Sequence, residues 1–268
     1  MDYNKSIAYT ISGSDSGGGA GLQADLKVFS AFKVHGCSVT TAITSQNTLG
    51  IQHVLQIPKE VILSQFDSLK TDLPPNVIKT GMLGDAIEAV YEILKKISVP
   101  IICDPVLNSS SGTSLLTKEK LDFFKKNILP LTSILTPNLI ESKILLERDD
   151  LTSEEMANAF LDLGVKSILI KGGHSKDDIC SDFFNDGIKS FFMESQRIKT
   201  RSTHGTGCIL SSAIAASIAS KQKMDQAVIT AKTYLNQALN NAEEIGNGFG
   251  PADFAPPCNE INYKPNII

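Results

Sequence analysis

Residues 203–208 (THGTGC) combine the residue types that can bind a negative charge and accept a proton. They lie at the start of a helix of small residues that the sequence predicts over 207–219. Two glycines let consecutive backbone N–H groups converge on one point, and a helix N-terminus adds partial positive charge. We therefore interpret Gly205, Thr206 and Gly207 as an anion hole for a phosphoryl group in transfer.

Cys208 follows the anion hole directly and would face it. The positive end of a helix lowers the pKa of a thiol from its reference value of about 8.5, which makes thiolate available to take a proton from a substrate hydroxyl. This placement predicts that Cys208 is a general base. The alternative, from these six residues alone, is an inert buried cysteine in a helix cap.

A glycine-rich segment at residues 12–21 (SGSDSGGGAG) separates a predicted strand from a predicted helix. Glycines there let the backbone come close to a ligand, although a tight connection without any ligand is the alternative. The spacing does not match the G-x-G-x-x-G of a dinucleotide loop, and the chain contains no G-x-x-x-x-G-K-[ST] phosphate loop. The phosphates of a nucleotide must therefore bind elsewhere.

Polar residues also follow other predicted strands. Asn138 and Glu141 form an N-x-x-E pair on one helix face, from which both side chains could reach a hydrated Mg²⁺. The same spacing fits a capping box with Asn138 as N-cap. Lys171 and Asp104 each end a buried strand, and open α/β sheets place their ligand crevices at such strand ends.

Strand segments rich in β-branched residues alternate with segments of helical period, a pattern typical of βα units around a mainly parallel sheet. The predicted strands are 7–11, 39–44, 77–80, 99–103, 134–135 and 168–170, and the predicted helices are 22–32, 61–69, 87–97, 121–128, 207–219 and 225–242, with one more from Asn138. Asp186-Gly187 between short strands at 182–184 and 190–192 predicts an antiparallel edge hairpin. No linker or repeat divides the chain, so we expect one domain over residues 1–268.

Composition narrows the class of protein. Of the 268 residues, 42% are hydrophobic and 20% are charged, which is ordinary for a globular protein with a core. The net charge of -4, with scattered lysines and arginines, argues against a nucleic-acid partner. Five cysteines without a C-x-x-C pair indicate reduced thiols in a cytoplasmic protein. No segment resembles a signal peptide or is long enough to anchor the chain in a membrane.

Taken together, these segments resemble the ribokinase-like family, and within it the hydroxymethylpyrimidine and phosphomethylpyrimidine kinases of thiamine biosynthesis. The resemblance runs from about Ile7 to Pro251, and its carriers are the segments 12–27, 44–48, 79–83, 104–106, 111–112, 136–141, 171–174 and 203–208. It implies a three-layer α/β/α sandwich with a mainly parallel sheet. It also implies transfer of a phosphoryl group from ATP, with Mg²⁺, to hydroxymethylpyrimidine and then to its monophosphate. The family suggests a homodimer, and a monovalent cation is left open.

The resemblance assigns a role to each matching residue. Cys208 takes the place of the Asp base of sugar kinases, Asn138 and Glu141 act through Mg²⁺ and water, and Lys171 and Asp104 lie near the ATP phosphates. The residues around the substrate would be Gln46, Gly13, Asp25 and Met82.

Gln46 has a physical reason for its role. A carboxamide offers a donor and an acceptor side by side, which match the 4-amino group and the neighbouring ring nitrogen of an aminopyrimidine. The alternative for Gln46 is a solvated loop glutamine, and for Met82 it is plain core packing.

Two positions depart from relatives of this family. Ser110 stands where many relatives carry a lysine that helps bind phosphate, and Ser109 stands where a group of pyridoxal-phosphorylating enzymes carries a second cysteine. The absence of that cysteine favours pyrimidine over pyridoxal. The rival interpretations are a pyridoxal, pyridoxine or pyridoxamine kinase on the same fold, a nucleotide-dependent oxidoreductase, and a non-catalytic vitamin-binding sensor, which would not need Cys208 or the anion hole.

Overall fold

The computed structural model describes residues 5–107, 116–173, 178–254 and 264–268. The strands are β1 Ile7–Asp15, β2 His35–Asn47, β3 Gly50–Gln56, β4 Val77–Thr80, β5 Ile101–Cys103, β6 Ile134–Leu135, β7 Ile168–Ile170, β8 Ile179–Asn185, β9 Ser190–Gln196 and β10 Asn266–Ile267. The α-helices are α1 Gly21–Ala31, α2 Lys59–Asp72, α3 Ile87–Leu94, α4 Lys118–Phe123, α5 Leu139–Leu146, α6 Ser153–Asp162, α7 Thr206–Ala219 and α8 Met224–Asn240. A π-helical turn, Phe124–Ile128, continues α4, and short 3₁₀ turns lie at Gly84–Ala86 and Leu129–Leu131.

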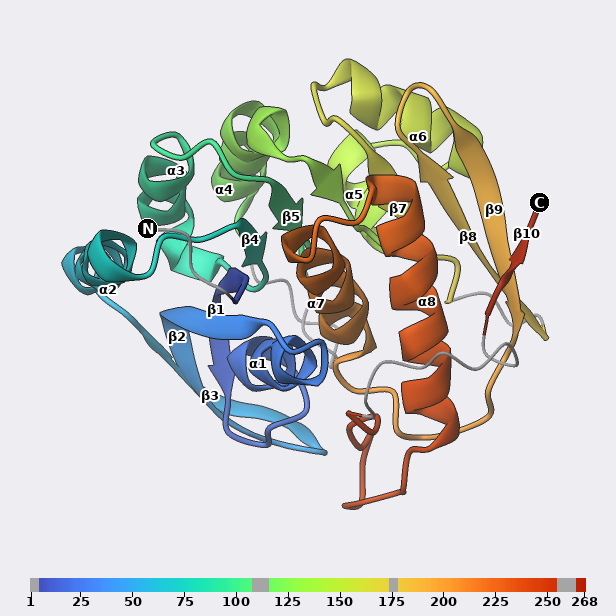
Figure 1. Ribbon diagram of the computed structural model, residues 1–268, viewed down its shortest axis with the longest axis horizontal. Coiled ribbons are helices and arrows are strands. Elements are labelled where there is room, and N and C mark those ends of the chain that lie inside the picture. Colours follow the sequence, from blue (N-terminus) through green and yellow to red (C-terminus); the bar gives the residue numbers. More distant parts are fainter. Residues whose placement is uncertain (1–4, 108–115, 174–177, 255–263) are drawn as a thin grey trace.

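All ten described strands form one sheet in the order β10-β9-β8-β7-β6-β5-β4-β1-β2-β3 (Figure 1). The strands from β2 to β7 in this order pair in parallel. Both edges are antiparallel, because β3 pairs with β2 at one end, and β8, β9 and β10 follow β7 at the other. The prediction of a mainly parallel sheet with an antiparallel edge hairpin is confirmed.

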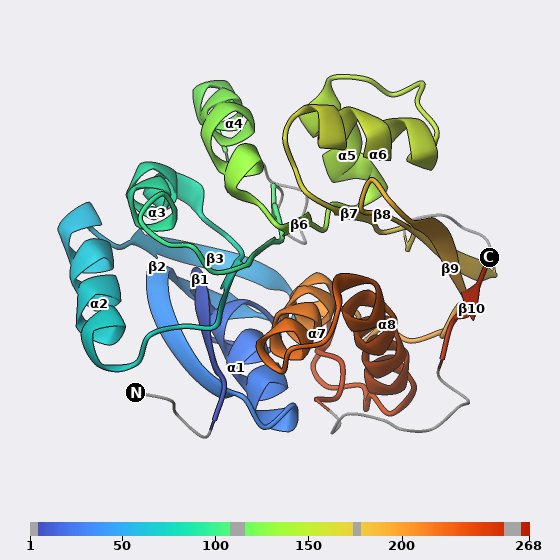
Figure 2. The ribbon, with the colours of Figure 1, turned by 45° about the horizontal axis from the view of Figure 1, so that its top comes forward.

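Helices cover both faces of the sheet and bury a separate apolar cluster on each (Figure 2). One cluster joins side chains of α2, α3, α5 and α6 to the sheet, with Phe66 and Phe160 among its largest members. The other joins α1, α7 and α8, and here alanines of α7 predominate, such as Ala213 and Ala216. Small side chains let a helix axis come close to the sheet. Among the described residues, no helix is long and apolar enough to cross a membrane.

Strand β1 extends further than its composition suggests. Residues 12–15 have turn-like types and were expected to be loop, yet they pair with β2, Ser14 opposite Ile43 and Asp15 opposite Thr44. The register shifts between Ser12 and Ser14. A bulge of this kind re-aims the side chains that follow it, and bulges are common beside active sites.

The sequence patterns missed three elements. Strand β3 forms a second hairpin with β2 through Thr48 and Leu49, which lack the Asn-Gly or Asp-Gly signature of a tight turn. Helix α6 was not recognised although Thr152 caps it with a complete capping box. The two-residue strand β10 pairs with β9, and so short a run carries no periodicity of its own.

A buried ion pair ties α1 to the sheet beneath the start of α7. The Lys79 ammonium lies 2.9 and 2.8 Å from the two oxygens of Asp25, and both side chains are fully buried. Asp25 also accepts hydrogen bonds from Thr10 at 2.5 Å and from Ser212 of α7 at 2.6 Å. Burial is the largest single influence and would lower the pKa of Lys79, but the charge and hydrogen bond of Asp25 together with other nearby negative charges, such as that of Asp104, outweigh it and raise this pKa. The lysine is therefore charged and fully paired.

Removing the carboxylate should destabilise the protein strongly. We expect Asp25→Ala to lower the free energy of unfolding by about 3–5 kcal/mol, because a buried ammonium is left without its partner. The matched control is the double variant Asp25→Leu/Lys79→Met, which removes both charges at similar volume and should recover much of the loss. Urea denaturation measures both variants. A loss under about 1 kcal/mol in Asp25→Ala, the size of an ordinary surface change, would contradict the expectation.

Candidate active site

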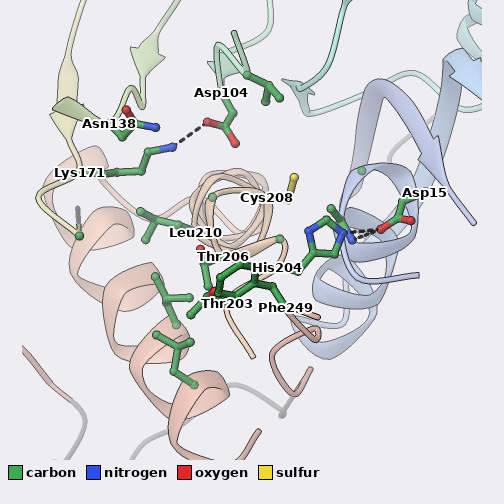
Figure 3. Close-up of a pocket in the computed structure, with 18 of the residues that line it drawn as sticks. Asp15, Asp104, Asn138, Lys171, Thr203, His204, Thr206, Cys208, Leu210 and Phe249 are labelled. Carbon is green, nitrogen blue, oxygen red and sulfur yellow. Dashed lines mark hydrogen bonds and ion pairs between the residues drawn. The ribbon is translucent and has the colours of Figure 1, made fainter. Parts of the chain in front are cut away.

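One cleft of about 580 Å³ lies at the carboxyl ends of the parallel strands. Residues from the ends of β1, β2, β4, β5, β6 and β7 line it together with the first turn of α7 (Figure 3). This is the crevice in which open α/β sheets bind their ligands. It is also the place in which the polar residues of the predicted strand ends were expected to meet.

The cleft brings together all but one of the residues predicted for the site. The predicted residues that line the cleft are Gly13, Gln46, Met82, Asp104, Asn138, Glu141, Lys171, Gly205, Thr206, Gly207 and Cys208. The exception is Asp25, which is fully buried with Lys79 and does not line the cleft. A direct contact between Asp25 and a substrate does not fit this placement, because its oxygens face Lys79, Thr10 and Ser212.

The first turn of α7 lines the cleft with Gly205, Thr206, Gly207 and Cys208. Gly205 is the N-cap residue, with φ of 80°, and Thr206 begins the helix. A Cβ atom on Gly205 would collide with the carbonyl oxygen of Gly19, and one on Gly207 would lie 3.2 Å from both Asp104 and Lys171. Gly205 is thus required by close packing and by its positive φ, whereas a side chain at position 207 would crowd Asp104 and Lys171.

Three charged residues lie on the sheet side of the cleft. The Lys171 ammonium is 2.9 Å from Asp104 Oδ1 and 3.9 Å from Glu141 Oε2, and all three side chains are largely buried. Burial raises the pKa of Glu141, and the neighbouring charge of Asp104 adds to this effect while Lys171 opposes it. Two carboxylates thus share one ammonium, and a second cation or a proton would neutralise the remaining negative charge.

Asn138 and Glu141 form the capping box that the spacing allowed. Asn138 Oδ1 accepts the Glu141 N–H at 2.9 Å, and Glu141 Oε2 accepts the Asn138 N–H at 2.8 Å. Both residues nevertheless line the cleft beside Lys171 and Asp104. Capping and contact with a hydrated ion are therefore compatible at this position, and the metal role stays a prediction.

Cys208 lies in the first turn of α7, half-buried in the cleft. The expected lowering of its pKa is wrong for the ligand-free protein. Burial raises the pKa of the thiol to about 11, and the charges of Asp25 and Asp104 act in the same direction. Lys79 and the Gly21 N–H oppose this rise but do not cancel it. The cysteine is consequently held as a neutral thiol.

Asp15 and His204 form a contact across the cleft that sequence reasoning missed. Asp15 Oδ2 lies 2.9 Å from His204 Nε2 (Figure 3). The same carboxylate accepts the backbone N–H groups of Gly17, Gly19 and Ala20. Burial alone would raise the pKa of Asp15, but these hydrogen bonds and His204 lower it. Both residues belong to motifs that were noticed, and an acidic residue inside a glycine-rich turn was the available signal.

The far end of the cleft was not predicted either. It lies between the edge hairpin and α8, and its lining residues include Gln196, Ile198, Leu235, Asn236 and Leu239. Leu235 and Leu239 are four residues apart and so share one face of α8. Their spacing was visible, but that this face borders a cleft depends on the packing of the hairpin.

Some of the predicted residues lie outside the described ranges. They are Ser109, Ser110, Ser111 and Gly112 of the loop after Asp104, His174, and Cys258. Within the described residues, no group of three or more His, Cys, Asp or Glu side chains is arranged to hold a metal ion by itself.

The raised pKa of Cys208 predicts how this thiol reacts. In the ligand-free protein, alkylation of Cys208 by iodoacetamide should accelerate roughly tenfold from pH 8.5 to pH 9.5, because the thiolate fraction keeps growing until the pH reaches a pKa of about 11. A thiol with the reference pKa of about 8.5 would accelerate less than about twofold. Mass spectrometry of the peptide that carries residue 208 separates it from the other cysteines, and an acceleration below about threefold would contradict the raised pKa.

The comparisons with known proteins agree with this site. The family model described as phosphomethylpyrimidine kinase matches residues 15–253. A Rhizobium meliloti protein named hydroxymethylpyrimidine/phosphomethylpyrimidine kinase is 41% identical over 253 residues, covering 91% of this chain and 95% of the relative. A Streptomyces coelicolor protein of the same name is 40% identical over 252 residues, covering 92% and 93%.

Solved structures give the same result for the fold. The pyridoxal kinase from Staphylococcus aureus in complex with ADP matches with a TM-score of 0.89 and 28% identity, covering 99% of this chain and 98% of that chain. The phosphomethylpyrimidine kinase from Clostridium difficile 630 matches with a TM-score of 0.77 and 36% identity, covering 88% and 100%. The predicted ribokinase-like three-layer architecture and the predicted family are both confirmed. This chain belongs to the phosphomethylpyrimidine kinase family.

Proposed function

We propose that this protein is a kinase that transfers the γ-phosphoryl group of ATP to the hydroxymethyl group of 4-amino-5-hydroxymethyl-2-methylpyrimidine, and then phosphorylates the monophosphate to the diphosphate. The observation that carries the proposal is a cleft that is lined by Gln46 and Met82, by the first turn of α7 and by Lys171 and Asp104. Curated relatives about 40% identical bear the corresponding name.

In the proposed reaction the first turn of α7 stabilises the phosphoryl group in transfer. The N–H groups of Gly205, Thr206 and Gly207 are held in place before the reaction, so little reorganisation is needed as charge develops. Cys208 stands at the same turn and takes the proton of the attacking hydroxyl. In a loose transition state the new P–O bond forms late, so the hydroxyl keeps its proton until late. Because Cys208 rests as a neutral thiol, it would first release its own proton to solvent when bound cations lower its pKa, and the resulting thiolate would then take the proton of the hydroxyl.

Magnesium fits the donors of this cleft. Mg²⁺ is usually held by one or two carboxylates together with phosphate oxygens and water. Glu141 and Asp104 supply carboxylates, and burial, with the charge of Asp104 in addition, raises the pKa of Glu141, an effect that a bound cation would oppose. We assign Asn138 and Glu141 to Mg²⁺ through water, and Lys171 with Asp104 to the neighbourhood of the ATP phosphates. When bound, Mg²⁺ would supply positive charge that offsets the negative charge of the phosphates.

The far end of the cleft suits a nucleoside. Leu235 and Leu239 offer an apolar wall, and Asn236 and Gln196 offer polar groups. The related pyridoxal kinase structures contain ADP or AMP-PCP, which supports a nucleotide site in this fold. We assign Gly13, Gln46 and Met82 to the binding of the pyrimidine substrate. Asp25 has a different role in this proposal, because it pairs with Lys79 beneath the site and does not contact the substrate.

We further propose that residues 1–268 act as one catalytic unit in the cytoplasm and that the enzyme is a homodimer. The continuous sheet supports the first part. For the dimer, Ile43 and Leu55 lie directly opposite each other on β2 and β3, and both are about half exposed, at 46% and 55%. Such an apolar pair on an edge hairpin would favour contact with a second copy.

Pyridoxal phosphorylation is the second candidate activity, because the pyridoxal kinases of Staphylococcus aureus and Bacillus subtilis are structural neighbours of this chain at 28% and 29% identity. A coupled kinase assay with hydroxymethylpyrimidine, its monophosphate and pyridoxal, each with and without K⁺, separates the alternatives. We expect kcat/KM for hydroxymethylpyrimidine to exceed that for pyridoxal by at least about tenfold, because only the aminopyrimidine edge matches the Gln46 carboxamide. A higher value for pyridoxal would reverse the assignment.

Cys208→Ala tests the base. It removes the proton acceptor but keeps the backbone N–H groups, so kcat should fall by roughly 10² to 10⁴ while ATP binding persists. The matched control is Cys180→Ala, which changes another half-buried cysteine of the same cleft and should leave kcat within about twofold. ATP affinity is measured by calorimetry and kcat by steady-state kinetics. Near-full turnover of Cys208→Ala would show that Cys208 is only a buried thiol.

A further inference from the structure

The side-chain amide of Gln46 lies between two groups that together determine its orientation. Gln46 Oε1 is 3.1 Å from Thr44 Oγ1, and Gln46 Nε2 is 3.1 Å from His204 Nε2. A carboxamide can also occupy this place after half a turn, with oxygen and nitrogen exchanged. The two orientations present the donor and the acceptor to a ligand in opposite order.

The Thr44 hydroxyl favours the turned orientation. Its oxygen lies 2.9 Å from the backbone carbonyl oxygen of Ser14, which can only accept a hydrogen bond. A hydroxyl has one proton, so when Thr44 donates to Ser14 it has only lone pairs to offer Gln46. An amide N–H of Gln46 can then donate a hydrogen bond to the Thr44 hydroxyl oxygen. An amide oxygen in the same place would face that oxygen without a proton between them.

The Asp15–His204 contact independently favours the same orientation. Asp15 Oδ2 accepts the N–H groups of Gly19 at 3.1 Å and Ala20 at 2.9 Å, so this oxygen is surrounded by donors. His204 Nε2, 2.9 Å away, must therefore carry a proton. A ring nitrogen that carries a proton cannot accept from Gln46 Nε2, but it can share its proton between Asp15 and an amide oxygen of Gln46.

We propose that Asp15 and His204 are positioning residues that hold the Gln46 carboxamide turned by 180°, with Oε1 accepting from His204 and Nε2 donating to Thr44. The backbone of Gln46 is fixed separately, because its N–H donates to Ser16 Oγ at 2.8 Å and its carbonyl oxygen accepts from the same hydroxyl at 2.9 Å. The backbone is thus held without help from the side chain, and Thr44 and His204 are the contacts that determine how the carboxamide is turned.

The orientation has a consequence for the substrate that depends on the pyrimidine kinase activity proposed above. Oε1 on the His204 side would accept from the 4-amino group, and Nε2 on the Thr44 side would donate to the neighbouring ring nitrogen. The hydroxymethyl group is attached next to the amino-bearing carbon, so it falls on the His204 side. Residues 205–208, with the proposed anion hole and Cys208, begin directly after His204. The opposite orientation would turn the ring over and direct the hydroxymethyl group away from them.

Solution NMR of the ligand-free protein tests the orientation without any activity. Nuclear Overhauser cross-peaks should connect the side-chain NH₂ protons of Gln46 with the methyl group of Thr44. ¹⁵N spectra should show that His204 carries its proton at Nε2 and donates a hydrogen bond to Asp15. Cross-peaks from these NH₂ protons to the His204 ring alone, with His204 unprotonated at Nε2, would overturn the inference.

Kinetics tests the consequence for specificity. The probes are the 4-amino substrate and its 4-oxo analogue, 5-hydroxymethyl-2-methylpyrimidin-4(3H)-one, in which donor and acceptor are exchanged. The preference is the kcat/KM for the amino substrate divided by the kcat/KM for the oxo analogue. His204→Leu should lower this ratio by about tenfold or more, because the carboxamide becomes free to turn. His204→Gln keeps an N–H₂ group at the position of Nε2 and should stay within about threefold of the wild-type ratio. The KM for ATP should change little in either variant.

Thr44→Val is a second, independent variant in case His204→Leu fails to fold. It removes the acceptor for Gln46 Nε2 at nearly constant volume and should also lower the preference. An unchanged ratio in a folded His204→Leu or Thr44→Val protein would overturn the positioning role, because a purely structural effect weakens both substrates alike. If the wild type phosphorylates neither pyrimidine, the proposed function is wrong, and the NMR experiment still decides the orientation of Gln46.

Discussion

The first turn of α7 has to lie in contact with the carboxyl ends of the central strands, and much of the molecule is arranged to allow this approach. Gly205 packs on the backbone of Gly19 and has no room for a side chain, and a side chain at Gly207 would crowd Asp104 and Lys171. The alanines and serines that follow let α7 lie close to β4 and β5. A helix of ordinary bulk would hold its N-terminus too far from the sheet to act on a ligand there.

Close approach also concentrates charge, and the structure balances it in two layers. Lys79 lies under the cleft with its charge matched by Asp25, and Lys171 lies in the wall of the cleft with its charge matched by Asp104. Such buried pairs contribute little net stability, but they fix the position of each partner because an unpaired charge is costly. Asp25 reaches Ser212 as well, so the same pair that neutralises Lys79 also anchors α7.

The sequence predicted the strands of the sheet centre well, because β6 and β7 are short continuous apolar runs followed by recognisable polar residues, and β4 is a β-branched segment that stops just before Gly81. It failed where pairing between distant segments overrides local composition. Residues 12–15 look like a turn and form a strand because β2 supplies their hydrogen-bond partners. The cleft residues were found through motifs, but the contact of Asp15 with His204 joins positions far apart in the chain, and the raised pKa of Cys208 depends on burial that no motif records.

The contact between Gly13 and Met82 shows how substitutions at separate positions in this cleft depend on each other. A Cβ atom on Gly13 would occupy the place of the Met82 methyl group, so β1 and the segment after β4 share one volume beside the substrate end. A side chain at position 13 therefore requires the flexible end of Met82 to move aside, so the two residues together set the space beside the substrate end. Directed evolution towards a ring of another size would sample this space best with libraries that vary both codons together.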